Sequence, residues 1–150
     1  MYYEIILNLK SRIYNRQKTP FDWLLEHVYY SDGNTKRISW VIKTNGSKVE
    51  HEREHADIYL DKVSNEQSKY IALHVGIFWG IGNYIIKNGD AIKVMLDSKS
   101  MYDHLVNDSQ ISDRLIEMRT FHIKQLIGQR KLKINYQLLE PEENLAGKLI

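Results

Sequence analysis

The sequence predicts one α/β domain with a mixed five-stranded sheet, preceded by an N-terminal extension. Three patterns lead to this prediction. Apolar runs separated by the turn dipeptides Asp32-Gly33 and Asn45-Gly46 are typical of an antiparallel meander. After Ser64 the apolar residues recur at helical spacing instead. The apolar run "AIKVMLDS" then lies between two helical segments, so it should pair in parallel. The predicted order is βββαβααβα.

Residues 1–25 form the predicted extension, and residues 26–150 form the domain. The extension is expected to be an amphipathic helix that ends before Pro20, although "YYEIIL" would also fit a strand. Its apolar stripe consists of Tyr2, Ile5, Ile6, Leu9 and Ile13, and its basic residues off the stripe are Lys10, Arg12, Arg16 and Lys18. Such a stripe could serve as a docking or dimerisation surface for a protein partner or a second copy.

The meander is expected to comprise three strands. The first begins at Glu26 and ends in the turn "SDGN", and the second is "KRISWVIKTNG". The third covers residues 47–63, and its many charged side chains suit the edge of a sheet. These first three strands should therefore be antiparallel.

The helical segments carry clear start and stop signals. Ser64 and Gln67 fit a capping box, and the helix should run to the turn at Asn88-Gly89. Its predicted inward face is Tyr70, Leu73, Ile77, Phe78, Ile81, Tyr84 and Ile85. After the parallel strand come a short helix at 100–106 and a longer one at 109–128, whose predicted inward residues are Ile111, Leu115, Met118 and Leu126. A last strand, "KLKINYQLLEP", precedes a short terminal helix.

Composition sets limits on function. The formal net charge of +2 is too small to indicate a nucleic-acid binder without local clusters of basic residues. The chain has no cysteine, which excludes disulfides and Cys-based zinc sites. No apolar run approaches the ~20 residues that span a bilayer. The start "MYYEIILNLK" does not resemble a signal peptide, so a cytoplasmic protein without membrane association is expected.

The segment "HEREH", His51 to His55, matches the H-E-x-x-H pattern of zinc peptidases. That chemistry requires a helix, which places both histidines on one face with the glutamate as general base. Here the segment follows a predicted hairpin turn, and in a strand the histidines share a face with Arg53 rather than with Glu52. An edge strand is therefore the better interpretation.

Four motifs within residues 26–150 resemble the ribonuclease H superfamily. "YYSDGN" is similar to its first catalytic strand, "SNEQSKYIAL" to its S-N-x-x-A-E-x-x-A-L helix start, "VMLDSKSMYDHL" to its D-S strand and helix, and "PEENLAGKL" to its R-E-x-N-x-x-A-D-x-L ending. They occur in the order and at the spacing of that family. The resemblance implies a ribonuclease H-like fold, with helices on both faces of the sheet.

In that family four carboxylates hold two divalent metal ions about 4 Å apart, which activate a water and stabilise the leaving oxygen of a phosphodiester. Carried over position by position, two of these carboxylates are retained as Asp32 and Asp97, and the other two fall on Lys69 and Lys148. A formal charge of −4 becomes zero, which removes the attraction for two metal ions. The resemblance therefore implies a degenerate site, in which the lysines pair with Asp32 and Asp97 and no cofactor is expected.

An active, metal-dependent ribonuclease stays open as an alternative. Glu66 lies one helical turn before Lys69 and could swing toward the same cleft, and Glu142 or Glu143 could replace the missing terminal aspartate. The cofactor would then be Mg²⁺ or Mn²⁺, and the reaction would be hydrolysis of RNA in RNA–DNA hybrids. The simpler interpretation is that Glu66 only favours the helix N-terminus.

The partner implied by the resemblance is nucleic acid, as RNA–DNA hybrid, RNA or DNA. The candidate binding residues are Asn34, Ser64, Asn65, Asn144, Lys131 and Lys133. The leading hypothesis is a nucleic-acid-binding protein with an inactive site. A protein-interaction module that does not bind nucleic acid is the second alternative, after the active enzyme.

Overall fold

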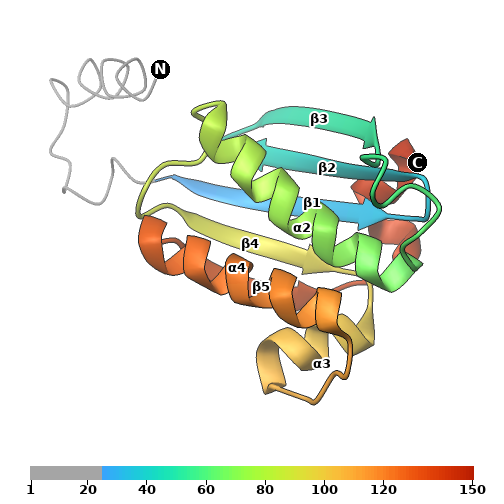
Figure 1. Ribbon diagram of the computed structural model, residues 1–150. Coiled ribbons are helices and arrows are strands. Elements are labelled where there is room, and N and C mark those ends of the chain that lie inside the picture. Colours follow the sequence, from blue (N-terminus) through green and yellow to red (C-terminus); the bar gives the residue numbers. More distant parts are fainter. Residues whose placement is uncertain (1–24) are drawn as a thin grey trace, which may run out of the picture.

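The computed structural model describes residues 25–150 (Figure 1). Residues 1–24, and with them the predicted amphipathic helix of the extension, lie outside the described residues. In chain order the elements are β1 (Glu26–Gly33), β2 (Arg37–Thr44), β3 (Ser47–Glu54), α2 (Asn65–Gly82), β4 (Ala91–Leu96), α3 (Lys99–Asn107), α4 (Arg114–Arg130), β5 (Lys133–Leu138) and the 3₁₀ helices η2 (Pro141–Glu143) and η3 (Leu145–Leu149).

The five strands form one mixed sheet in the order β3-β2-β1-β4-β5. β1 is antiparallel to β2, and β2 is antiparallel to β3, with Trp40 opposite His51. β4 pairs in parallel with both β1 and β5. The predicted mixed sheet is therefore confirmed, as are the antiparallel first three strands and the parallel pairing of the "AIKVML" run. β3 lies at an edge, as its charged sequence predicted.

Helices cover both faces of the sheet. α2 and α4 lie side by side on one face (Figure 1), and between them and the sheet lies a core that includes Tyr29, Trp40 and Leu73. On the other face η3 contacts β1 and β2, and the Ser39 hydroxyl donates to the carbonyl oxygen of Ala146 at 2.7 Å. The C-terminal segment is thus held against the sheet by a buried hydrogen bond.

Two glycines let the helix layer approach the sheet closely. A Cβ on Gly76 of α2 would stand 1.9 Å from the Tyr29 hydroxyl and 2.9 Å from the Trp40 ring. A Cβ on Gly33, at the end of β1, would stand 2.2 Å from the Ser68 hydroxyl oxygen. All three distances are below van der Waals contact, so only glycine fits at either position. The second contact brings the start of α2 directly against the end of β1.

The third strand is shorter than predicted. β3 ends at Glu54, and residues 57–62 form turns, in which Tyr59 and Leu60 both donate their backbone N–H to the carbonyl of Ala56. Two residues of "ADIYLDKV" still contact the core from a loop: Val63 is buried and Tyr59 packs against the core, whereas Ile58 is 69% exposed. The run was interpreted as a strand because a loop segment with alternate apolar residues has the same local pattern.

Helix α2 also ends earlier than predicted. Its capping box at Ser64 and Gln67 is confirmed, but Asn83 ends it, and Tyr84 has a left-handed backbone (φ 62°). The side chains of Phe78 and Tyr84, predicted to point inward, are 60% and 64% exposed. The buried side of the helix carries the predicted Tyr70, Leu73 and Ile77, together with the small residues Gly76 and Gly80. Within residues 25–150 no helix is long and apolar enough to cross a membrane.

The second long helix begins at Arg114, with Asp113 as its N-cap, and not at residue 109. Its buried residues are Ile116, Thr120, Ile123 and Leu126. Met118, predicted to point inward, is 53% exposed, because the buried face is rotated away from it. The predicted short terminal helix consists of the two 3₁₀ turns η2 and η3.

A polar contact joins α2, α4 and the loop before α2. The Arg119 guanidinium donates to His74 Nδ1 at 3.0 Å and to the Tyr59 hydroxyl at 2.9 Å. Burial, then the positive charge of Arg119 and that of His122, lower the pKa of His74 to about 4. His74 therefore serves as a neutral acceptor in the folded protein.

This arrangement predicts a loss of stability in mild acid. In the unfolded chain a histidine has a pKa near 6.5, so between about pH 6.5 and 4 the unfolded state binds more protons than the folded state. The stability that the neutral His74 contributes is therefore complete above this range and is lost as the pH falls through it. Urea unfolding at pH 7.5 and pH 5 should show that His74→Gln reduces this pH-dependent loss by about 1 kcal/mol, after allowance for partial exposure. An unchanged pH dependence in the variant would contradict the assignment.

Candidate functional site

The site lies where two neighbouring parallel strands end. Asp32 is near the end of β1, and Asp97 directly follows β4, so the parallel pairing brings the two carboxylates to the same edge of the sheet. Lys69 lies near the start of α2, next to Ser68, which packs against Gly33. The side chains of two strands and one helix therefore meet at one point.

Lys69 bridges the two aspartates. Its Nζ donates to Asp32 Oδ1 at 2.7 Å and to Asp97 Oδ1 at 2.9 Å. The side chains of Lys69, Asp32 and Asp97 are only 21%, 16% and 6% exposed, so water screens these ion pairs less than it screens surface pairs. The predicted pairing of Lys69 with both aspartates is present.

The ion pairs keep Lys69 charged. Burial acts to lower the pKa of Lys69, but the hydrogen bonds that Lys69 donates to Asp32 and Asp97, and the negative charges of these aspartates, together outweigh it, so the pKa lies above its ordinary value. Since the folded pKa exceeds the unfolded one, the stability that Lys69 contributes is fully present below about pH 10.5 and is lost as the pH rises through the folded value. The formal charges of Lys69, Asp32 and Asp97 sum to −1.

Asn144 holds Asp97 from the other side. It is 1% exposed, and its Nδ2 donates to Asp97 Oδ2 at 2.9 Å and to the carbonyl of Ser31 at 3.0 Å. Its Oδ1 accepts a hydrogen bond from the backbone N–H of Ala146, so Asn144 is also the N-cap of η3. All its polar atoms are therefore engaged inside the protein, and Asn144 positions Asp97 relative to β1 and η3. The sequence indicated Asn144 as a nucleic-acid-binding residue and did not predict that it holds Asp97.

Glu66 lies beside the site but is occupied by other partners. Its Oε2 accepts from the hydroxyls of Ser98 at 2.8 Å and Ser100 at 2.6 Å. Ser98 is also the N-cap of α3. These two serines were not among the predicted site residues, although Ser98 directly follows Asp97 in the sequence. The geometry ties Glu66 to the start of α3 rather than to Lys69.

Lys148, Glu142 and Glu143 remain at the surface. All three are exposed, and Glu143 Oε1 accepts the backbone N–H of Glu140, which caps η2. Within residues 25–150 no ion pair joins Lys148 to Asp32 or to Asp97. Of Lys69 and Lys148, only Lys69 therefore contacts the aspartates directly within the described residues.

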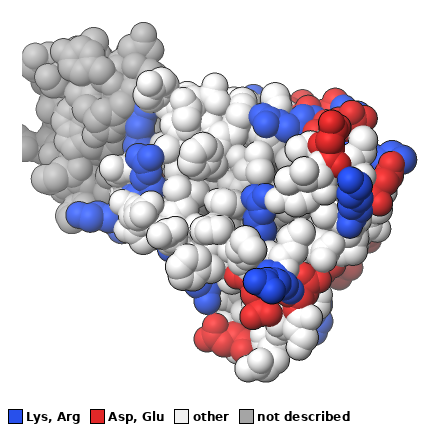
Figure 2. Space-filling view, viewed as in Figure 1, with Lys and Arg blue, Asp and Glu red and all other residues white. Residues whose placement is uncertain are grey.

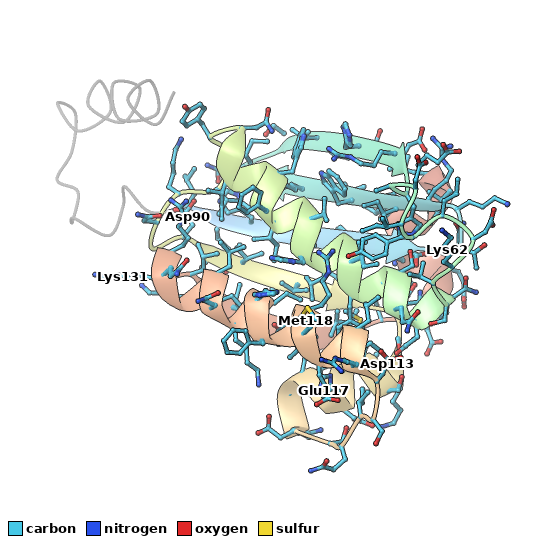
Figure 3. All side chains as sticks on the ribbon, in the orientation of Figure 1. Lys62, Asp90, Asp113, Glu117, Met118 and Lys131 are labelled. Carbon is cyan, nitrogen blue, oxygen red and sulfur yellow. The ribbon has the colours of Figure 1, made fainter. Side chains whose placement is uncertain are left out.

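The candidate nucleic-acid-binding residues fall into two groups at opposite ends of the sheet. Asn34 follows β1, and Ser64 and Asn65 begin α2, all at the end that carries Asp32. Lys133 pairs with Ala91 at the start of β4, and Lys131 precedes it. Figure 3 shows this separation, with Lys131 and Asp90 at one end and Lys62 and Asp113 at the other. Six β4 residues at about 3.3 Å each place Lys133 about 20 Å from Asp97.

The histidines of "HEREH" have structural contacts. His51 stacks on Trp40 with 4.9 Å between ring centroids and lies 5.2 Å from the Trp79 ring. Nε2 of His55 lies 2.7 Å from the Ser68 hydroxyl and 3.0 Å from the carbonyl of Asn34. No group of three His, Asp or Glu side chains in the described part of the chain is arranged to hold a metal ion.

A pair of divalent metal ions does not fit the residues between β1 and β4. Such ions require oxygen ligands and a surplus of negative charge. Here the Lys69 ammonium already takes one oxygen of each aspartate, and Asn144 takes the second oxygen of Asp97. A metal ion at this position would have to displace a paired cation.

The fold is similar to known ribonucleases H. Ribonuclease H1 of the archaeon Halobacterium salinarum superposes with a TM-score of 0.65 at 14% identity, over 83% of this chain and 92% of that one. LC11 ribonuclease H1, solved in complex with an RNA/DNA hybrid, superposes with 0.64 at 13% identity over 83% and 92%. The N-terminal ribonuclease H domain of a Mycobacterium tuberculosis protein superposes with 0.63 at 15% identity over 83% and 90%.

No protein-family profile and no curated protein matches the sequence. The structural similarity nevertheless shows that the chain has the ribonuclease H-like fold, which confirms the resemblance that the motifs indicated. At such low identity the similarity establishes the fold and not the chemistry of the site.

Proposed function

We propose that the protein binds nucleic acid on a ribonuclease H-like scaffold and does not cleave it, because Lys69 has replaced the two-metal centre. The observation that carries the proposal is the contact of one ammonium with both Asp32 and Asp97. The complex of the similarly folded LC11 ribonuclease H1 with an RNA/DNA hybrid supports nucleic acid as the ligand class.

The chemistry of the site argues for binding without hydrolysis. Cleavage of a phosphodiester requires a nucleophilic water activated at neutral pH and a positive centre for the leaving oxygen. Lys69 supplies one positive charge, but as a protonated amine with three donors it cannot accept a proton from water. Asp32 and Asp97 are both held by Lys69, so neither is free to act as a general base without breaking that contact.

Titration with labelled RNA–DNA hybrid, duplex DNA and single strands tests the proposal, each with and without Mg²⁺ or Mn²⁺ and read for both binding and cleavage. We expect binding of at least one of these ligands, no requirement for metal, and no cleavage. Metal-dependent cleavage that Asp32→Asn abolishes would establish the active ribonuclease instead. Absence of binding to every nucleic acid would remove the proposed ligand class.

Salt dependence tests whether the contacts are to phosphates. If binding is electrostatic, log affinity should fall linearly with log salt concentration, with a slope set by the number of phosphates neutralised. Charge reversal at Lys131 and Lys133 should reduce that slope by about two if the ligand extends along the sheet from the Asp32 end to the Lys131 end. The matched control is Lys148→Glu, which reverses a positive charge at the Asp32 end of the sheet instead of the Lys131 end. A slope that only Lys148→Glu reduces would restrict the ligand to the Asp32 end.

A further inference from the structure

An apolar seam runs between the outer surfaces of α2 and α4. One hollow along it is lined by His74, Val75, Phe78 and Arg119. The next is lined by Tyr59, Arg114, Leu115, Met118 and Arg119. Phe78 and Met118 are both largely exposed, and Figure 2 shows this face as mostly uncharged surface. Arg119 at the floor is already bonded to His74 and Tyr59, so the seam presents apolar side chains rather than a free cation.

A third hollow extends this seam to the end of the molecule. It is lined by Ile81, Tyr84, Ile86, Lys87, Asn88 and Arg130. Ile81 lies one helical turn beyond Phe78, and Tyr84 is again largely exposed. This third hollow is mixed, because Lys87, Asn88 and Arg130 line it beside the apolar residues, whereas Val75, Phe78, Leu115 and Met118 line the other two. Exposed apolar surface of this kind usually marks a contact site.

The described chain starts beside this end of the seam. The backbone N–H of Leu25 donates to Asp90 Oδ1 at 3.1 Å, and its carbonyl accepts from Ala91. Asp90 also accepts from the backbone N–H of Lys87, and Gly89 donates to the carbonyl of Arg130 at the end of α4. Leu25 is therefore close to the C-terminal ends of both helices that border the seam.

We propose that residues 2–13 of the same chain lie in the seam between α2 and α4. As a helix these 12 residues would be about 18 Å long, shorter than the 17-residue α4 at about 25 Å. Residues 14–24 can span up to about 35 Å, enough to reach any part of the seam from Leu25. The stripe of Tyr2, Ile5, Ile6, Leu9 and Ile13 provides the matching apolar face.

The tether favours this occupant over a second copy of the protein. A segment attached at Leu25 acts at an effective concentration in the millimolar range, above that of a free partner. In the proposed arrangement the basic residues of the segment face solvent, because they lie off the apolar stripe.

Paired cysteines test the proposal on a chain that has none of its own. Leu9→Cys is on the stripe, and Ser11→Cys, two residues on, is on the opposite side of the predicted helix. Each is combined with Phe78→Cys or, separately, with Met118→Cys. For at least one of the two seam cysteines, at position 78 or 118, mild oxidation should form the disulfide with Leu9→Cys about tenfold faster than with Ser11→Cys, within one chain. The reason is that a disulfide requires Cα atoms within about 7 Å. The rate should not depend on protein concentration.

Equal rates for the two positions with both partners would overturn the proposal, as would disulfides that form only between chains. A second measurement does not depend on cross-linking. Leu9→Lys should release the segment and raise the binding of an apolar fluorescent dye several-fold, whereas Ser11→Lys should leave it unchanged. Identical dye binding by both variants and the parent would also overturn the proposal.

Discussion

The double variant Lys69→Glu with Lys148→Asp is expected to melt at a lower temperature than the parent without metal and to regain stability when Mg²⁺ or Mn²⁺ is added. Loss of the Lys69 ammonium leaves Asp32 and Asp97 without their cation, and the new glutamate adds a third negative charge beside them. Removing one partner of such a poorly exposed pair costs about 3 kcal/mol, which corresponds to a melting temperature about 9 °C lower for a protein of this size.

Metal binding should restore most of that loss. A metal concentration 100 times the dissociation constant stabilises the folded state by about 2.7 kcal/mol, so the melting temperature should rise with metal concentration. Lys69→Glu alone should show a smaller response, and Lys148→Asp alone none, because Lys148 is exposed and pairs with neither aspartate. The control is Lys69→Gln, which removes the cation without adding a ligand charge.

Thermal melting in a metal titration measures these differences. If the double variant gains no more stability from metal than the parent does, Lys69 and Lys148 do not occupy the family's carboxylate positions. Cleavage activity is a weaker readout, because catalysis also requires positioning within about an ångström.

The variant Asp90→Ala is expected to lose about 3–5 kcal/mol of stability, the largest effect of any single substitution considered. Asp90 is completely buried, and its carboxylate lies 2.8 Å from Nε2 of the buried His27. The same carboxylate accepts from the backbone N–H groups of Leu25 and Lys87. Alanine would leave the partly buried N–H groups of Leu25 and Lys87 without this acceptor, and Thr44 would be the remaining hydrogen-bond partner of the buried His27 ring.

Urea unfolding compares Asp90→Ala with Asp57→Ala, in which an exposed aspartate of the 57–62 turns is removed. The exposed substitution should change stability by less than about 0.5 kcal/mol. A loss below about 1 kcal/mol for Asp90→Ala would mean that water replaces the carboxylate and that the contact does not secure the start of β1.

The sequence predicted the parts of the fold that local chemistry determines. Asn45 and Gly46 adopt the positive φ that a tight hairpin requires, and Ser64 and Gln67 form the expected reciprocal cap. The crossover between β1 and β4 followed from the order of the elements, because a strand between two helices must pair in parallel. Asp32, Asp97 and Lys69 lie together, as the resemblance to the ribonuclease H superfamily implied.

The remaining differences arise from tertiary contacts that a local pattern does not contain. Phe78 was assigned to the inward face with Leu73 and Ile77, but it lies one residue beyond Ile77 and points to another side of α2, while Gly76 and Ile77 lie against the sheet. Lys131 and Lys133 were proposed as nucleic-acid-binding residues together with Asn34, Ser64 and Asn65, and the parallel register of β5 places the two lysines at the opposite end of the sheet from these three. The burial of Asn144 against Ser31 was not predicted, because that contact joins residues 113 positions apart.

The hydrogen bonds of Asn144 determine when the site can form during synthesis of the chain. The β1–β2–β3 meander pairs residues that are close in sequence, so it can form early, as local contacts do. Asn144 donates hydrogen bonds to the carbonyl of Ser31 and to Asp97. These two contacts can form only after Asn144 has left the ribosome. Nascent chains that stop before this residue should therefore show a protected meander and an unprotected Asp32–Asp97 end in hydrogen exchange.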